Sequence, residues 1–142
     1  MWVGDAIYPL TQFLEIPFWP NTLAGPTEVK SYYDQLKNSK PYQALLKSTK
    51  VIGIWDDHDS GMGNGDSSNP ALDQMKKLYL DFLDEPINSQ RHQPGVGLWV
   101  SYYLDTQKQV KLILLDGHYG RTGEDDLGPD QMAWLRGNPF FP

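Results

Sequence analysis

Hydrophobic positions recur at helical spacing in the first half of the chain and predict two helices there. After Pro26-Thr27, an apolar or aromatic residue returns every three or four positions, at Val29, Tyr32, Tyr33 and Leu36. A second, shorter helix is expected to begin at Pro41 and to run through Leu46, because proline is tolerated at the first position of a helix.

Two further helices are predicted in the second half of the chain. Asn69 is expected to cap a helix that has Pro70 at its first position and closes at Glu85-Pro86. Its apolar stripe is the clearest in the sequence and consists of Leu72, Met75, Leu78, Tyr79, Phe82 and Leu83. A last helix is expected to start near Gly128-Pro129 and to stop at Gly137.

Short apolar runs between these helices predict strands. Residues 51–55 have the composition of a central strand, and Trp2-Val3 resembles the end of a buried one. Residues 98–104 and 110–115 are rich in β-formers and are joined by a short polar loop, which indicates a hairpin. The aromatic and proline-rich residues 16–21 are expected to form a surface loop. The fold class expected is therefore α/β.

Composition narrows the classes of protein to which the chain can belong. It has 142 residues, no cysteine, 12 Lys+Arg against 18 Asp+Glu, and a net charge of -6. The length suits one domain, and the absence of cysteine excludes disulfide scaffolds, zinc fingers and thiol catalysis. The negative charge argues against a dedicated nucleic-acid binder, which needs a surplus of Lys and Arg. No apolar run is long enough for a membrane span.

Acidic residues follow three of the apolar runs. Asp5, the pair Asp56-Asp57, and Asp116 each stand where a predicted strand ends. Ligands of layered α/β sheets gather beyond the carboxyl ends of strands, so these acids could converge on one cation. Alternatively, each aspartate caps the next turn, which aspartate often does. The histidine inside Asp57-His58-Asp59 favours a site over a set of caps.

Two common phosphate and cation motifs are excluded by spacing. An EF-hand loop that began at Asp57 would have Gly61 at its fifth position and Ser68 at its twelfth, where acidic ligands are required. The glycine-rich stretches also lack the Gly-Lys-Ser/Thr ending of a P-loop.

These motifs together resemble one enzyme family. Gly4-Asp5-Ala6-Ile7-Tyr8, Trp55-Asp56-Asp57-His58-Asp59 and Leu114-Leu115-Asp116 look like the PhoD-like (alkaline phosphatase D) branch of the calcineurin-like metallophosphoesterases. Their order and spacing agree with that family over nearly the whole chain. The resemblance implies an αββα sandwich with a mixed central sheet. It also implies hydrolysis of phosphomonoesters or phosphodiesters by a dinuclear metal centre, with Fe3+ beside Ca2+ or another divalent cation.

The resemblance also assigns roles to particular residues. It implies that Asp5 bridges two metal ions, that Tyr8 ligates the ferric ion, and that Asp57 binds the second metal. His58 would contact the phosphoryl group or protonate the leaving oxygen, and Asp59 would orient that imidazole. Two cations suit this chemistry because they hold the ester and stabilise the attacking and leaving oxygens.

Four other polar residues are weaker candidates. Arg121 could bind a substrate phosphate, or it could pair with one of the acids at positions 124–126. Asp116 is expected to support the fold rather than to bind metal. His118 is expected at most at the rim of a pocket, and His92 in a solvated polar loop.

Some motifs of that family do not occur in this sequence. Its first metal motif would precede Gly4-Asp5 and its last histidine motifs would follow Trp134-Leu135, so residues 1–142 are expected to be a partial PhoD-like domain. Incomplete sheets expose edges through which chains can associate. Two hypotheses therefore stay open: a metal-dependent phosphoesterase, or a catalytically inactive fragment that acts as a cation-binding or interaction module.

Overall fold

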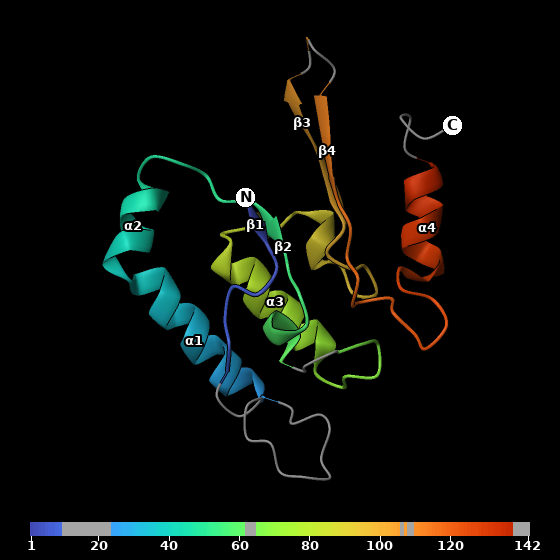
Figure 1. Cartoon of the computed structure of the whole chain (residues 1–142), viewed down its shortest axis with the longest axis horizontal. Helices are drawn as coiled ribbons and strands as arrows, with labels where there is room; N and C mark the ends of the chain where they lie inside the picture. Colours follow the sequence, from blue (N-terminus) through green and yellow to red (C-terminus); the bar gives the residue numbers. More distant parts are fainter. Residues whose placement is uncertain (10–23, 62–64, 106, 108–109, 138–142) are drawn as a thin grey trace.

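The computed structural model describes residues 1–9, 24–61, 65–105, 107 and 110–137. Within them the chain forms a mixed α/β structure with two small sheets (Figure 1). The helices are α1 (Pro26–Asn38), α2 (Lys40–Leu46), α3 (Leu72–Phe82) and α4 (Gly128–Arg136), with short 3-10 turns η2 (His58–Ser60) and η3 (Gln90–His92). The strands are β1 (Trp2–Val3), β2 (Gly53–Ile54), β3 (Val100–Asp105) and β4 (Val110–Leu114). The loop expected at residues 16–21 lies outside the described part.

The described strands form two pairs instead of the single mixed sheet that was expected. β1 lies parallel to β2, with Trp2 opposite Gly53, while β3 and β4 form the predicted antiparallel hairpin. Among the described residues no backbone ladder joins β2 to β4. Side chains connect the two pairs instead, at the residues that follow β2 and β4.

Helices α1 and α2 confirm the first two predicted helices. α1 begins at Pro26, and α2 begins one residue before Pro41. Ser39 separates them because its side chain accepts a hydrogen bond from the backbone nitrogen of Tyr42 and caps α2.

Helix α3 is confirmed, but the capping role predicted for Asn69 is wrong. The helix begins at Leu72, and its N-cap is Ala71. The side chain of Asn69 instead closes a turn before the helix by accepting a hydrogen bond from the nitrogen of Ala71 at 2.9 Å. Its amide donates to the carbonyl of Ser60 at 2.9 Å, so Asn69 fastens the start of α3 to η2.

Stacked aromatic rings form the centre of the core. The Phe82 ring at the end of α3 stacks on Tyr33 of α1 at 4.9 Å and on Tyr42 of α2 at 5.3 Å between ring centroids. Trp2 of β1 meets the same ring edge-on at 6.1 Å. Each such pair contributes roughly 0.5–1.5 kcal/mol beyond the burial of area. One side chain thus holds three helices and the first strand together.

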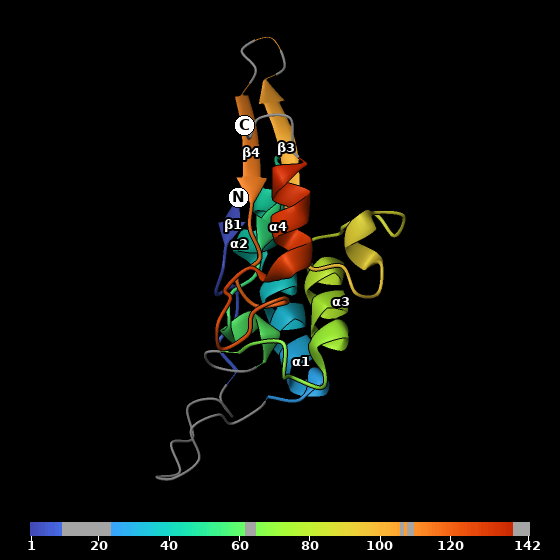
Figure 2. The same ribbon diagram turned by 90° about the vertical axis from the view of Figure 1, so that its right-hand side faces the viewer.

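The hairpin and α4 form the other half of the molecule. Both views show β3 and β4 projecting beyond the helices around β1 and β2, with α4 beside the hairpin (Figures 1 and 2). α4 covers residues 128–136 and has Gly137 as its C-cap, as predicted. No helix in the described part of the chain has both the length and the apolar composition needed to span a membrane.

Candidate metal centre

The end of β1 places Asp5 through an unusual stretch of backbone. Gly4 and Asp5 both have positive φ, at 81° and 51°. Aspartate is one of the few non-glycine residues that adopt this left-handed conformation readily. At Gly4, a Cβ atom would lie 2.7 Å from the Cβ of Asp56, so only glycine fits there. The β1 and β2 ends are therefore in direct contact.

The segment that follows β2 places Asp57 and His58. After β2 the chain turns at Asp57 into η2, and the Asp57 carboxylate accepts a hydrogen bond from the nitrogen of His58 at 2.8 Å. This cap engages one oxygen of the Asp57 carboxylate. The short parallel pairing of β1 with β2 is what brings these two loops together.

Asp5, Asp57 and His58 form a cluster that could hold a cation. One ligand atom from each residue lies within 4.8 Å of the others, and all three residues are partly buried. His58 Nε2 lies 4.0 Å from Asp57 Oδ1. The Oδ1 atom of Asp5 is buried and has no hydrogen-bond partner among the described residues. A buried carboxylate oxygen without a partner is costly, and a cation would satisfy it.

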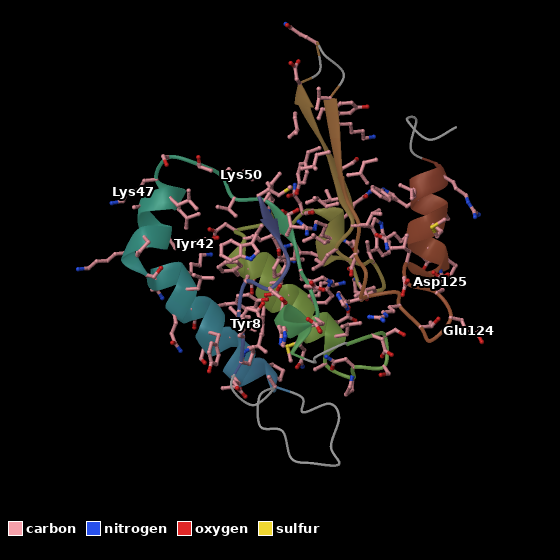
Figure 3. The ribbon with its side chains drawn as sticks, viewed as in Figure 1. Tyr8, Tyr42, Lys47, Lys50, Glu124 and Asp125 are labelled. Atoms are coloured by element: carbon pink, nitrogen blue, oxygen red, sulfur yellow. The ribbon has the colours of Figure 1, made fainter. Side chains whose placement is uncertain are left out.

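Tyr8 belongs to the same cluster. Its hydroxyl donates to Asp5 Oδ2 at 2.6 Å, and its ring lies 4.6 Å from the His58 ring. The hydrogen bond to Asp5, together with burial and the charges of Asp5, Asp57 and Asp59, raises the pKa of Tyr8 to about 12. The phenol therefore stays protonated at neutral pH unless a cation replaces its proton. Figure 3 shows Tyr8 below the end of β1, close to α1.

Asp59 lies beneath the cluster and joins its two loops. Its Oδ1 accepts hydrogen bonds from the nitrogens of Ala6 and Ile7 and from the Tyr33 hydroxyl, and its Oδ2 accepts from the nitrogen of Asp56. The side chain is fully buried. Burial raises its pKa to about 6, while these hydrogen bonds oppose the rise. The structure thus gives Asp59 an anchoring role, and its action on His58 stays a prediction.

Asp116, the third strand-end acid, does not join the cluster. It is fully buried, and its Oδ1 accepts hydrogen bonds from Trp55 Nε1 and from the nitrogens of His118 and Tyr119. Its Oδ2 accepts from the nitrogen of Leu98. The prediction that the acids after all three apolar runs converge on one site is therefore wrong. The expectation that Asp116 supports the fold is confirmed.

His118 is more deeply placed than a residue at a pocket rim. It is only 8% exposed, and its Nε2 lies 2.6 Å from Asp56 Oδ1. Its Nδ1 lies 2.8 Å from the carbonyl oxygen of Gly65. The contact between His118 and Asp56 was not expected from the sequence. The available signal was the position of His118 just after a strand-end aspartate, because strand ends that share an edge approach one another.

The remaining candidates lie elsewhere. Arg121 Nε is 3.5 Å from Asp126 Oδ1. This ion pair matches the alternative in which Arg121 pairs with one of the acids at positions 124–126. The neighbouring Glu124 and Asp125 lie well apart from Tyr8 in Figure 3. His92 is half-buried, with Nε2 3.3 Å from the carbonyl oxygen of Glu85, and is not the solvated side chain that was expected.

The donor set suits a hard cation. Two carboxylates, a phenol and an imidazole converge, which are ligands that iron and similar ions accept. These four residues suffice for one ion with open positions, whereas a dinuclear centre needs more ligands than they supply. No protein-family profile, curated protein or solved structure matches the chain.

Proposed function

We propose that this chain carries the cation-binding and acid–base part of a metal-dependent phosphoric ester hydrolase. The observation that supports the proposal is the meeting of Asp5, Asp57 and His58 within 4.8 Å, beside a buried Asp5 oxygen without a hydrogen-bond partner in the described part. The resemblance to PhoD-like enzymes supplies the reaction class. The substrates would be phosphomonoesters or phosphodiesters.

The residues of the cluster would have distinct tasks. Asp5 and Asp57 would hold the cation, and Tyr8 would contribute its phenolate once its proton is lost. His58 would donate a proton from its ring to the leaving oxygen of the ester. When bound, a single hard cation such as Fe3+ would supply charge that stabilises the phosphoryl oxygens and acidifies water. Arg121 is proposed to meet the substrate phosphate after release from Asp126.

One observation favours a second candidate function. The described cluster offers ligands for a single ion, and the described residues contain no second group of this kind. A chain with one weakly held cation and no second metal could act as a cation-binding or interaction module without catalysis. Metal content and turnover, measured together, separate the two functions.

The first experiment measures metal and activity on the same samples. We expect purified chain, dialysed and analysed by inductively coupled plasma mass spectrometry, to retain iron or another hard cation near one equivalent. We also expect it to hydrolyse p-nitrophenyl phosphate or bis(p-nitrophenyl) phosphate. Asp57→Ala should lose both properties because it removes a charged ligand from the cluster.

Asp34→Ala is the matched control, since Asp34 is an exposed aspartate of α1 that pairs with Lys30. It should retain metal and activity. Bound metal without turnover would support the binding module. Metal content that is the same in the parent chain and in Asp57→Ala would overturn both candidates.

A further inference from the structure

His118 lies behind the cation cluster and contacts the residue between its two loops. Asp56 precedes Asp57 in the chain, and its side chain packs against Gly4, which precedes Asp5. The His118 ring reaches Asp56 Oδ1 from the segment after β4. A single side chain of the hairpin half therefore touches the junction from which both carboxylate ligands project.

The hydrogen-bond pattern defines what His118 can do there. The carbonyl oxygen of Gly65 can only accept, so Nδ1 of His118 carries a hydrogen. Nε2 lies 2.6 Å from Asp56 Oδ1, within hydrogen-bond distance. Both nitrogens of the imidazole therefore have a partner. Direct ligation of the cation or proton transfer to substrate is therefore not its role.

His118 is itself held rigidly. Its backbone nitrogen donates to Asp116 Oδ1 at 3.0 Å, and the same oxygen accepts from Trp55 Nε1 at 2.7 Å. Since Trp55 precedes Asp56, the contacts close a ring from the end of β2 through Asp116 and His118 to Asp56. The two hydrogen bonds to Asp116 are buried, and the contact with Asp56 is partly buried, so this ring restrains the position and the orientation of the Asp56 carboxylate.

We propose that His118 is a positioning residue that, by holding Asp56 against Gly4, sets the separation of Asp5 and Asp57 for cation binding. This inference rests on the proposed cation site. The hairpin half of the molecule would then change the affinity of a cation site to which it supplies no ligand. Side chains that hydrogen-bond directly to metal ligands typically change metal affinity by about 10–100-fold, and His118 acts through the residue next to a ligand, so the lower end of this range is expected.

Terbium(III) is the probe for the test, because it is a hard cation whose luminescence lifetimes in H2O and D2O count the waters on the bound ion. In the parent chain we expect saturable terbium binding. In His118→Ala we expect affinity to fall about tenfold and the number of bound waters to rise as a protein ligand is lost. His118→Gln should restore both values in part, since its amide can donate to Asp56.

The direction in which terbium affinity changes in His118→Ala distinguishes a positioning role from a purely electrostatic one. Removal of His118 leaves an uncompensated charge on Asp56, which by itself would strengthen cation binding. Unchanged or tighter binding in a folded His118→Ala chain would therefore overturn the inference. If His118→Ala does not fold, His118→Gln and Asp56→Ala replace it in the test. The inference would be overturned if both variants bound terbium with the affinity and the number of waters of the parent chain.

The control is His92→Ala, which removes an imidazole that contacts the carbonyl oxygen of Glu85. It should leave affinity and water count unchanged even if it lowers the melting temperature. Failure of the parent chain to bind terbium would overturn the proposed function and the inference together. Binding by the parent that is insensitive to His118 would overturn the inference alone.

Discussion

Single residues at the end of β1 determine whether the cluster can form. Gly4 has φ at 81° and leaves no room for a side chain, because Asp56 packs against it. Asp5 follows in the same left-handed region with φ at 51°. The sequence indicated Asp5 as a candidate through its place after an apolar run. It could not show that the neighbouring glycine is required by contact with Asp56, because that contact spans 52 positions of chain.

Gly4→Ala is expected to destabilise the protein by roughly 1–3 kcal/mol, since it adds left-handed strain and a 2.7 Å contact with the Asp56 Cβ. Urea denaturation followed by circular dichroism measures this change. Gly117→Ala is the matched control, because a Cβ there would meet nothing within 4 Å. Equal midpoints for both variants would contradict the packing described at Gly4.

A second prediction concerns Asp73 and Tyr119, which join α3 to the segment after β4. The Tyr119 hydroxyl donates to Asp73 Oδ1 at 2.8 Å. This hydrogen bond is the largest cause that lowers the pKa of Asp73 from 3.8. A carboxyl whose folded pKa is lowered contributes stability above its unfolded pKa and loses it as the pH falls.

Tyr119→Phe should therefore lower the free energy of unfolding by about 1 kcal/mol at neutral pH, after allowance for the partial exposure of Asp73. The difference from the parent should shrink as the pH falls below 3.8, because Asp73 is protonated first in the unfolded chain and, at still lower pH, in the folded chain as well. Urea titrations from neutral to acidic pH measure it. Tyr103→Phe, on the exposed part of the hairpin, serves as control. A difference that does not change with pH would refute this assignment.

At the scale of elements, buried side-chain hydrogen bonds connect β2 to β4, which a continuous sheet would join through backbone hydrogen bonds. β2 and β4 are not neighbours in a ladder, and the Asp116 carboxylate connects their ends through Trp55 and His118. Gln131 of α4 adds a second connection: its Oε1 accepts from the nitrogen of Asp116, and its Nε2 donates to the Asp116 carbonyl oxygen. Helix α4 is thereby fastened to the end of β4.

Asp116→Ala is expected to destabilise the protein by roughly 3–5 kcal/mol, because it leaves three buried donors and one partly buried donor without their acceptor. The unfolding midpoint in urea measures this loss. Asp126→Ala removes an exposed carboxylate from the same segment and should change stability by less than about 0.5 kcal/mol. A loss below about 1 kcal/mol for Asp116→Ala would contradict its role as the connection.

The elements themselves were largely predictable, whereas their connections were not. Apolar spacing located α1, α2, α3 and α4 and the hairpin, because each forms from contacts that are near in sequence. Asn69 was misjudged as a helix cap since its side chain has two partners, one local and one in η2. Asp116 and His118 act through residues about sixty positions away, and hydrophobic periodicity carries no information about such pairs.

At the scale of the whole molecule, the described residues are unequally packed. The α1–α3 side holds the aromatic core, with Val29, Tyr79 and Leu80 fully buried. The outer part of the hairpin leaves Tyr103, Leu104 and Val110 exposed on projecting strands (Figure 2). Association through sheet edges, which the sequence suggested, stays a prediction for these exposed strands.

Amide hydrogen exchange should distinguish the aromatic core from the outer part of the hairpin. We expect α3 amides to exchange about a hundredfold more slowly than those of β3 and β4 near Leu104, because local stability follows buried apolar contact. Mass spectrometry of peptic fragments measures both regions in one sample. Equal protection would mean that the two halves open as one unit.

The left-handed turn at Gly4-Asp5 also bears on how conservation among homologous sequences should be interpreted. Backbone geometry alone restricts position 4 to glycine and position 5 to aspartate, asparagine or glycine. Invariance of this pair across homologues would thus be expected even where no ion is bound. Asp57 has ordinary right-handed dihedrals, with φ at -60° and ψ at -45°, which most residues adopt. Because Asp57 also caps η2, which serine or threonine could do as well, retention of a carboxylate at position 57 in place of those residues would be the trace of the proposed cation site.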